Sequence, residues 1–188
     1  GTLVDNVLAF SRAERRQVRL SPEPAELAPL VREALESFAP LAAARRTTVR
    51  ERLHQGVTAS VDRGAIRQVL LNLLDNAVKY GPPGQTIEVG LAAAEGTARI
   101  TVQDQGPGIP PRERERIFAP FVRLKRDAES AVAGSGIGLS VVAQLAALHG
   151  GRVRVEEAAG GGARFVVELP AEQAGAAQGR TPAAEGVA

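Results

Sequence analysis

The sequence predicts one domain that contains both helices and strands, on three observations. The chain has 188 residues, which is enough for one domain with a sizeable core plus appendages. Hydrophobic residues make up 44% and charged residues 23% of the chain, as is ordinary for a globular protein. Segments whose apolar residues have helical spacing are interspersed with short segments in which apolar and polar residues alternate. The predicted class is therefore α+β.

Composition excludes several functional classes. The formal net charge is +2, which gives no electrostatic case for nucleic-acid binding or for a polybasic membrane anchor. The sequence has no Cys, so it offers neither a disulfide framework nor a thiolate metal site, in keeping with a reducing compartment. One Tyr, five Phe and no Trp are too few for a base-stacking surface. We therefore expect no nucleic-acid partner.

The first residues indicate a piece of a longer protein, because position 1 is Gly and the sequence contains no Met. Residues 2–18 have the apolar spacing of a helix without an N-terminal cap, and the Pro-containing segment 21–24 is interpreted as a linker. No apolar run approaches the roughly 18 residues of a membrane span, and no signal peptide is visible. We expect a cytoplasmic location and leave open an anchor of the parent protein in the inner membrane.

The remaining elements follow from apolar periodicity and from turn residues. The predicted helices are 25–46, a helix capped by Asp62 that ends at Tyr80, a short charged helix at 111–117, and 138–149. The predicted strands are 47–53, 57–61, 86–91, 98–104, 152–156 and 163–169, with a turn at 55–56 and a hairpin formed by the last pair. A loop is predicted at 125–133, and the Ala- and Gly-rich segment 171–188 is predicted to be a disordered tail.

The helix ending at Tyr80 carries an unusual polar strip of Gln68, Asn72, Asn76 and Lys79 opposite its apolar side. Asn does not favour helix, so a solvent-facing strip normally contains Glu, Lys and Arg instead. An Asn side chain can offer a carbonyl oxygen to Mg²⁺, and Lys79 can offer an ammonium group to a phosphate. For this segment alone, two tolerated Asn residues on a wet face remain the favoured alternative. The glycine motifs downstream reverse that preference.

Asp104 continues the buried face of the strand 98–104, where a carboxylate is costly unless a hydrogen-bond donor meets it. The glycines that follow, Gly106 and Gly108, allow close approach to the backbone. The alternative is a simple turn in which Asp104 caps local amides. A second Gly-rich segment, 134–138, opens a helix and is typical of an anion site. His149, in the last turn of that helix, is interpreted as a partner of the helix dipole.

Taken in order, these motifs resemble those of the catalytic ATP-binding domain of sensor histidine kinases, in the superfamily shared with type II topoisomerases and heat-shock chaperones. The segments that resemble the family's N, G1, F and G2 boxes are 72–80 (NLLDNAVKY), 104–108 (DQGPG), 118–121 (FAPF) and 134–139 (GSGIGL). Each box alone is weakly specific, but four in order form a specific match, covering about 25–170. Residues 3–12 resemble the end of the second helix of the dimerisation and histidine-phosphotransfer bundle, to which we assign 1–20.

The resemblance implies a two-layer α/β sandwich of the Bergerat type, with a mixed sheet and helices on one face. It also implies that Asn76 ligates Mg²⁺ with support from Asn72, and that Lys79 and Arg123 contact phosphate oxygens. By the same resemblance, Asp104 accepts a hydrogen bond from the amine of adenine. The other implied nucleotide-binding residues are Tyr80, Gly106, Gly108, Ile109, Phe121, Gly134, Ser135, Gly136, Ile137, Gly138 and Leu139.

The implied activity is that of a protein-histidine kinase, which binds Mg-ATP and transfers the γ-phosphate to a histidine on its own dimerisation bundle. A response regulator is a further implied partner. The acceptor motif, a His followed by an acidic residue on the first bundle helix, is missing, because His54 and His149 lie in other contexts. We expect a homodimer for the full-length protein and leave a monomeric fragment open.

Three other activities compete with this interpretation. In the related ATPases a Glu four residues before the metal-binding Asn activates water, and here that position is Asn72, whose amide cannot take a proton. A nucleotide-sensing module without turnover, and a serine kinase of the same superfamily, remain as alternatives. The sequence also departs from the family at Ala119 and Val122, where many members carry Glu and Tyr.

Overall fold

The computed structural model describes residues 19–124 and 135–171. The predicted helix at 2–18, the predicted loop at 125–133, Gly134 and the predicted tail beyond Ala171 therefore lie outside the described residues. Ala171 itself is held in place, because its backbone N–H donates to the carbonyl of Gly96 over 2.8 Å.

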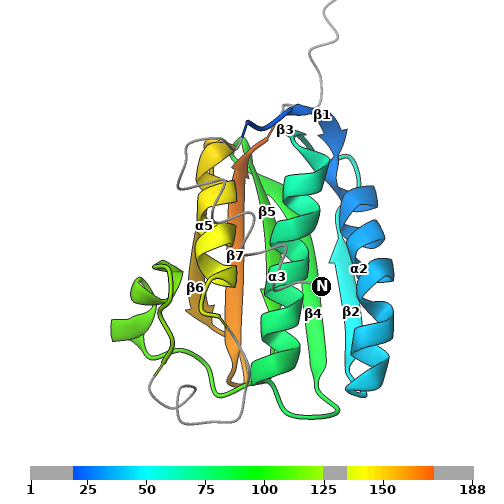
Figure 1. Cartoon of the computed structure of the whole chain (residues 1–188). Coiled ribbons are helices and arrows are strands. Elements are labelled where there is room, and N and C mark those ends of the chain that lie inside the picture. The colour runs from blue at the N-terminus through cyan, green and yellow to red at the C-terminus, as the bar shows by residue number, and fades with distance from the viewer. Residues whose placement is uncertain (1–18, 125–134, 172–188) are drawn as a thin grey trace, which may run out of the picture.

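A five-stranded mixed sheet forms one layer of the fold, in the order β2-β4-β5-β7-β6 (Figure 1). The strands are β2 (Thr48–Leu53), β4 (Thr86–Ala94), β5 (Thr97–Gln103), β7 (Ala163–Pro170) and β6 (Arg152–Glu157). β2 runs parallel to β4, whereas every other neighbouring pair is antiparallel. The predicted α+β class and the predicted hairpin of the last two strands are confirmed.

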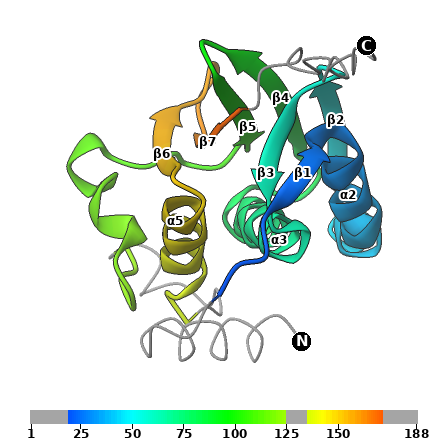
Figure 2. The same cartoon turned by 90° about the horizontal axis from the view of Figure 1, so that it is seen from above.

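The helices α2 (Leu27–Ala44), α3 (Arg63–Tyr80) and α5 (Gly138–Leu148) cover one face of this sheet, as the view from above shows (Figure 2). Alternate residues of the strands face them, and the sheet residues Ile87 and Ile100 are fully buried with Leu70 and Leu74 of α3. Each such side chain contributes roughly 1.5–3 kcal/mol by its removal from water. The implied two-layer sandwich with helices on one face is therefore confirmed.

The ends of α3 are those that the sequence predicts. The Asp62 carboxylate accepts a hydrogen bond from the backbone N–H of Ala65 at 2.9 Å, which satisfies one of the free amides in the first turn. The helix ends at Tyr80, before Gly81. None of the described helices combines the length and the apolar character that crossing a bilayer requires.

His149 joins the end of α5 to the start of α3. Its Nε2 accepts a hydrogen bond from the backbone N–H of Asp62 at 3.0 Å, while its Nδ1 lies 2.7 Å from the carbonyl oxygen of Leu145. The contact with the Leu145 carbonyl agrees with the expected role of His149 at the end of the helix. The ring is in addition a hydrogen-bonded bridge between α5 and α3.

A small two-stranded ribbon was not predicted. β1 (Glu23–Glu26) pairs antiparallel with β3 (Thr58–Val61), so the segment interpreted as a linker supplies half of β1 and the following helix begins at Leu27. Pro24 cannot donate a hydrogen bond, which a two-stranded ribbon tolerates because each of its strands has a free edge. The turn at 55–56 therefore leads from the large sheet into the ribbon.

The predicted charged helix at 111–117 is also wrong in type. The segment forms two short 3₁₀ helices, η1 (Pro111–Glu113) and η2 (Arg116–Phe118), because a single turn of each kind fits between the glycine-rich loop after β5 and Pro120.

Candidate functional site

A pocket opens beside the C-terminal half of α3, at the end of β5 and the start of α5. The site residues predicted from the sequence that line it are Asn76, Tyr80, Asp104, Gly108, Ile109, Arg123 and Leu139. The other lining residues are Pro107, Ile117, Val122, Leu124, Ala163 and Phe165. α3, the residues that follow β5 and η2, β7 and the start of α5 thus bring amide, phenol, carboxylate and guanidinium groups to one cavity.

Asp104 is the buried polar group at the base of this pocket, with 4% of its surface exposed. Its Oδ1 accepts hydrogen bonds from the backbone N–H groups of Gly106, at 2.8 Å, and Ala163, at 3.0 Å. Burial raises the pKa of the Asp104 carboxyl, and these two hydrogen bonds oppose that shift. Oδ2 accepts no hydrogen bond from the described residues. The carboxylate therefore has one oxygen fixed by the fold and one available to a donor.

The alternative that Asp104 only caps local amides is thus correct for one of its oxygens and leaves the other unexplained. The hydrogen bond from Ala163, 59 residues further along the chain, is reciprocated because the Asp104 N–H donates to the Ala163 carbonyl at 2.9 Å. Sequence reasoning missed this anchor. The Gly161-Gly162 pair before Ala163 was the available signal.

Two glycines are required where the chain packs against Asp104. A Cβ on Gly106 would lie 2.9 Å from the carbonyl oxygen of Tyr80, and a Cβ on Gly162 would lie 2.1 Å from the carbonyl oxygen of Asp104. Gly162 also has a φ of +95°, which other residues rarely adopt. These glycines let the protein's own backbone close around the carboxylate. Gly106 does not itself line the pocket.

The polar strip of α3 is only partly exposed. Asn72 is 3% exposed and its Nδ2 has no hydrogen-bond partner among the described residues, so the wet-face alternative is wrong for this residue. A buried amide without a partner is costly, which indicates that a group outside the described residues completes its surroundings. Asn76 and Tyr80 line the pocket. Lys79 Nζ lies 2.5 Å from the carboxylate of Asp75, one helical turn earlier.

The start of α5 is joined to the segment around Phe121. The Phe121 N–H donates to the Gly136 carbonyl at 3.0 Å, and the Ile137 N–H donates to Ser135 Oγ at 3.4 Å. The Phe121 side chain is 66% exposed and does not line the pocket. Of the predicted glycine-rich motif Leu139 lines the pocket, whereas Ser135, Gly136, Ile137 and Gly138 do not, and Gly134 falls outside the part of the chain that the structure describes.

The apolar walls were not predicted as site residues. Phe165 and Ile117 line the pocket, and the rings of Phe118 and Phe165 meet edge-to-face with centroids 6.4 Å apart. Strand alternation places Phe165 on the buried face, but it does not distinguish a core position from a pocket wall. An apolar slot with a carboxylate at its base suits a flat heteroaromatic group with an exocyclic amine.

Comparison with known proteins decides the family. The model of the family described as "Histidine kinase-, DNA gyrase B-, and HSP90-like ATPase" matches residues 61–173. The chain belongs to this family.

Relatives within it are sensor kinases. The chain is 37% identical over 168 residues to the sensor histidine kinase TmoS of Ectopseudomonas mendocina, covering 89% of this chain and 17% of TmoS. It is 35% identical to the adaptive-response sensory kinase SasA of a Synechococcus strain, covering 90% of this chain and 45% of SasA. The chain thus spans less than half the length of these relatives.

Solved structures of histidine kinases share the fold. Full-length ShkA in complex with AMPPNP has a TM-score of 0.78 and 34% identity, with 90% of this chain and 35% of ShkA covered. The mycobacterial sensor histidine kinase MprB has a TM-score of 0.69 and 31% identity, with 80% of this chain and 98% of that chain covered.

The described residues of this histidine kinase-like ATPase domain include no group of three or more His, Cys, Asp or Glu side chains placed to hold a metal ion. Mg²⁺ is commonly bound by one or two protein oxygens together with phosphates and water. The side-chain oxygen of Asn76, which lines the pocket, fits that mode. The unpartnered atom of Asn72 is Nδ2, a hydrogen-bond donor, which suits a phosphate or water oxygen near the ion and cannot ligate the ion itself. A magnesium ion held mainly by a nucleotide is therefore compatible with the donors present.

Proposed function

We propose that this chain is the ATP-binding catalytic part of a two-component sensor histidine kinase. In this function it binds Mg-ATP, and the γ-phosphate is transferred to a histidine on a dimerisation bundle. The observation that carries the proposal is the Asp104 carboxylate, fixed through Oδ1 at the base of a pocket that Asn76, Tyr80 and Arg123 also line. Relatives named sensor histidine kinases, and the neighbouring structure with AMPPNP, support it.

The proposed recognition of adenine follows from the geometry of Asp104. Its Oδ2 accepts the exocyclic amine, while Ile109, Ile117 and Phe165 enclose the base in the apolar slot. Tyr80 packs at the edge of the same slot. Gly108 lines the slot, while Gly106 lets the backbone close around Asp104. We assign the loop 134–138 and Phe121 to the binding of the phosphate groups.

We assign the binding of the phosphate groups to the polar strip of α3 and to Arg123. Asn76 offers its carbonyl oxygen to Mg²⁺, which when bound neutralises charge on the phosphate oxygens. Asn72 donates from its buried amide toward the same region, and Lys79 leaves Asp75 to contact a phosphate oxygen. Because Asn72 cannot act as a base, attack by water is not assisted, and the γ-phosphate is retained for a histidine.

The proposed partners are those of a two-component kinase. They are the chain's own dimerisation and phosphotransfer bundle, to which we assign residues 1–20, and a response regulator. We propose a homodimer for the full-length protein and no nucleic-acid partner. A cytoplasmic location of this domain follows from its use of ATP.

The decisive experiment separates transfer from binding. The 188-residue chain is incubated with radiolabelled MgATP, alone and with the parent's separately expressed bundle. We expect no labelling of the chain itself and slow, concentration-dependent labelling of the bundle, because the tether that raises the effective concentration is absent. The label should be acid-labile and base-stable, as in phosphohistidine. Acid-stable labelling of the chain would instead identify a serine kinase, and rapid phosphate release would identify an ATPase.

Nucleotide binding without any transfer to the bundle would identify a sensing module. A bundle in which the acceptor His is replaced by Gln provides the matched control, because it keeps the docking surface and removes the nucleophile.

A further inference from the structure

The face of the sheet turned away from the helices contains a hollow of about 460 Å³ that the kinase function does not use. It crosses the strands from β2 to β6, and among the described residues no helix covers this face (Figure 2). Its floor is formed by Gly90, Thr101 and Val166, and its walls include Arg52, Arg99 and Arg164.

Basic charge gathers on this face. Strand register places six arginines and three glutamates at positions that point away from the helices, an excess of three positive charges. The whole chain carries a formal net charge of only +2. The residues are Arg50, Arg52, Arg99, Arg152, Arg154 and Arg164 with Glu88, Glu156 and Glu168. The excess positive charge of the domain is therefore local to the outer face of the sheet.

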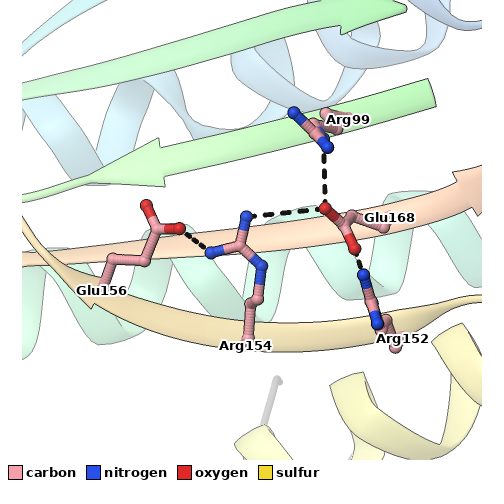
Figure 3. Close-up of polar contacts among 5 residues, drawn as sticks. All are labelled: Arg99, Arg152, Arg154, Glu156 and Glu168. Carbon is pink, nitrogen blue, oxygen red and sulfur yellow. Dashed lines mark hydrogen bonds and ion pairs between the residues drawn. The ribbon is translucent and has the colours of Figure 1, made fainter. Parts of the chain in front are cut away.

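Glu168 holds part of this cluster in a fixed arrangement (Figure 3). It is 5% exposed, and its two oxygens lie 3.0 Å from Arg99 Nε and 2.6 Å from Arg152 Nε. Both arginines use Nε for this contact, so their terminal nitrogens are not engaged by Glu168. Arg154 is more fully occupied, since it contacts both Glu168 and Glu156. Arg52 and Arg164 are exposed and form no ion pair with the described residues.

The backbone conformation at Gly90 does not require glycine. It lies inside β4 between two hydrogen-bonded neighbours, where glycine weakens a strand, and its φ is not in the left-handed region. A Cβ at this position would approach only one side-chain atom closely, Thr101 Oγ1 at 2.5 Å, which rotation of the Thr101 side chain can relieve. Because Gly90 has no side chain, the hollow is deeper at this position. A glycine in the middle of a strand is typical of a site that another backbone approaches closely.

We propose that this hollow binds an extended acidic segment of a partner protein. Guanidinium groups match carboxylates in geometry and charge, and Arg52 and Arg164 with the terminal nitrogens of Arg99 supply the donors. Apart from His54, the hollow is lined by no aromatic side chain on which a nucleic-acid base could stack, and a flat lipid surface would leave its floor unfilled. An extended chain passing over Gly90 fills it.

The test uses the 188-residue chain and a fluorescein-labelled octaglutamate peptide, with affinity read from fluorescence anisotropy and no nucleotide present. We expect binding that weakens with salt and falls at least about tenfold in the double variant Arg52→Glu, Arg164→Glu. The control Arg67→Glu makes the same kind of charge change on the exposed helix side, and it should leave the affinity nearly unchanged. The thermal midpoint of each variant is measured to confirm folding.

The variant Gly90→Val tests the shape of the hollow. We expect it to abolish peptide binding, and the thermal midpoint is measured to confirm folding because the new Cβ meets Thr101 Oγ1 unless that side chain rotates. The proposal is overturned if the parent does not bind the peptide, or if the double arginine variant binds as the parent does. Equal losses in the double variant and in Arg67→Glu would also overturn it. So would tighter binding of a thymidine octanucleotide, or of anionic vesicles, through the same arginines.

Discussion

Replacing Asp104 by Asn inverts a pocket-lining hydrogen-bonding group, whose Oδ2 accepts no hydrogen bond from the described residues. The Asn carbonyl can keep both hydrogen bonds that Oδ1 accepts, from Gly106 at 2.8 Å and Ala163 at 3.0 Å. Its amide then replaces Oδ2 and presents donors where the parent presents an acceptor. The fold should therefore survive, while an exocyclic amine on the ligand meets a donor in place of an acceptor.

The expected size follows from the bond removed. A hydrogen bond to a charged group contributes about 1.5–3 kcal/mol, and each 1.4 kcal/mol is tenfold in Kd, so MgATP should bind about 10- to 150-fold more weakly. Inosine triphosphate carries a carbonyl oxygen at the position of the adenine amine, which the new amide can bind. The parent should therefore prefer ATP, and Asp104→Asn should lose or reverse that preference.

Stability provides an internal check on this variant. Because burial raises the pKa of the Asp104 carboxyl in the folded state, keeping it ionised near pH 7 disfavours folding. Asp104→Asn removes that charge and should unfold no earlier than the parent at neutral pH.

The assay is isothermal titration calorimetry with both nucleotides, and Glu95→Gln, in the exposed turn between β4 and β5, is the matched control. Unchanged ATP affinity in Asp104→Asn, or equal binding of the two nucleotides by the parent, would refute the role of this carboxylate.

Three further predictions concern stability. MgATP at about 100 times its Kd should raise the free energy of unfolding by about 2.7 kcal/mol, seen as a higher thermal midpoint, and an unmoved midpoint would contradict nucleotide binding. Gly162→Ala should lower stability by about 2 kcal/mol or more in chemical denaturation, since its Cβ meets the Asp104 carbonyl at a φ of +95°, whereas Gly160→Ala, which has open space, should cost less. The hydrogen bond from Arg152 holds the pKa of Glu168 below its usual range, so its stabilising contribution is present above the unfolded-state pKa and is lost as the pH falls through the folded-state pKa. Glu168→Gln should cost about 1–3 kcal/mol at pH 7 and flatten the acid limb of the stability curve, and a parent-like acid limb would count against this assignment.

Local sequence signals predicted much of the fold. α3 was predictable with its Asp62 cap because apolar spacing, a capping residue and a terminating glycine agree at one place. β1 was missed because four residues containing Pro24 carry no strand signal of their own, and their pairing with β3 depends on contacts about 35 residues away.

Contacts between segments far apart in the sequence also limited the prediction of the site. The motifs indicated Asn76 and Asp104, both of which line the pocket, because unusual residue types stand out against helix and strand patterns. The donor from Ala163 and the wall formed by Phe165 reach the pocket through the pairing of β5 with β7, which no local pattern reveals. Burial of Asn72 also escaped prediction, since a helical strip opposite the core normally faces water.

His149 joins the C-terminal end of α5 to the N-terminal end of α3 by a hydrogen bond with Asp62. The same Asp62 that His149 contacts also accepts a hydrogen bond from the Ser21 N–H at 3.0 Å, so three segments meet at this point. The pocket lies at the other ends of both helices, about 27 Å away along α3, which has 18 residues at 1.5 Å each. Over that length a tilt of α3 by about 2° corresponds to a displacement of about 1 Å at the pocket end. The hydrogen bonds at Asp62 thus connect Ser21, just before β1, to two helices whose far ends line the pocket.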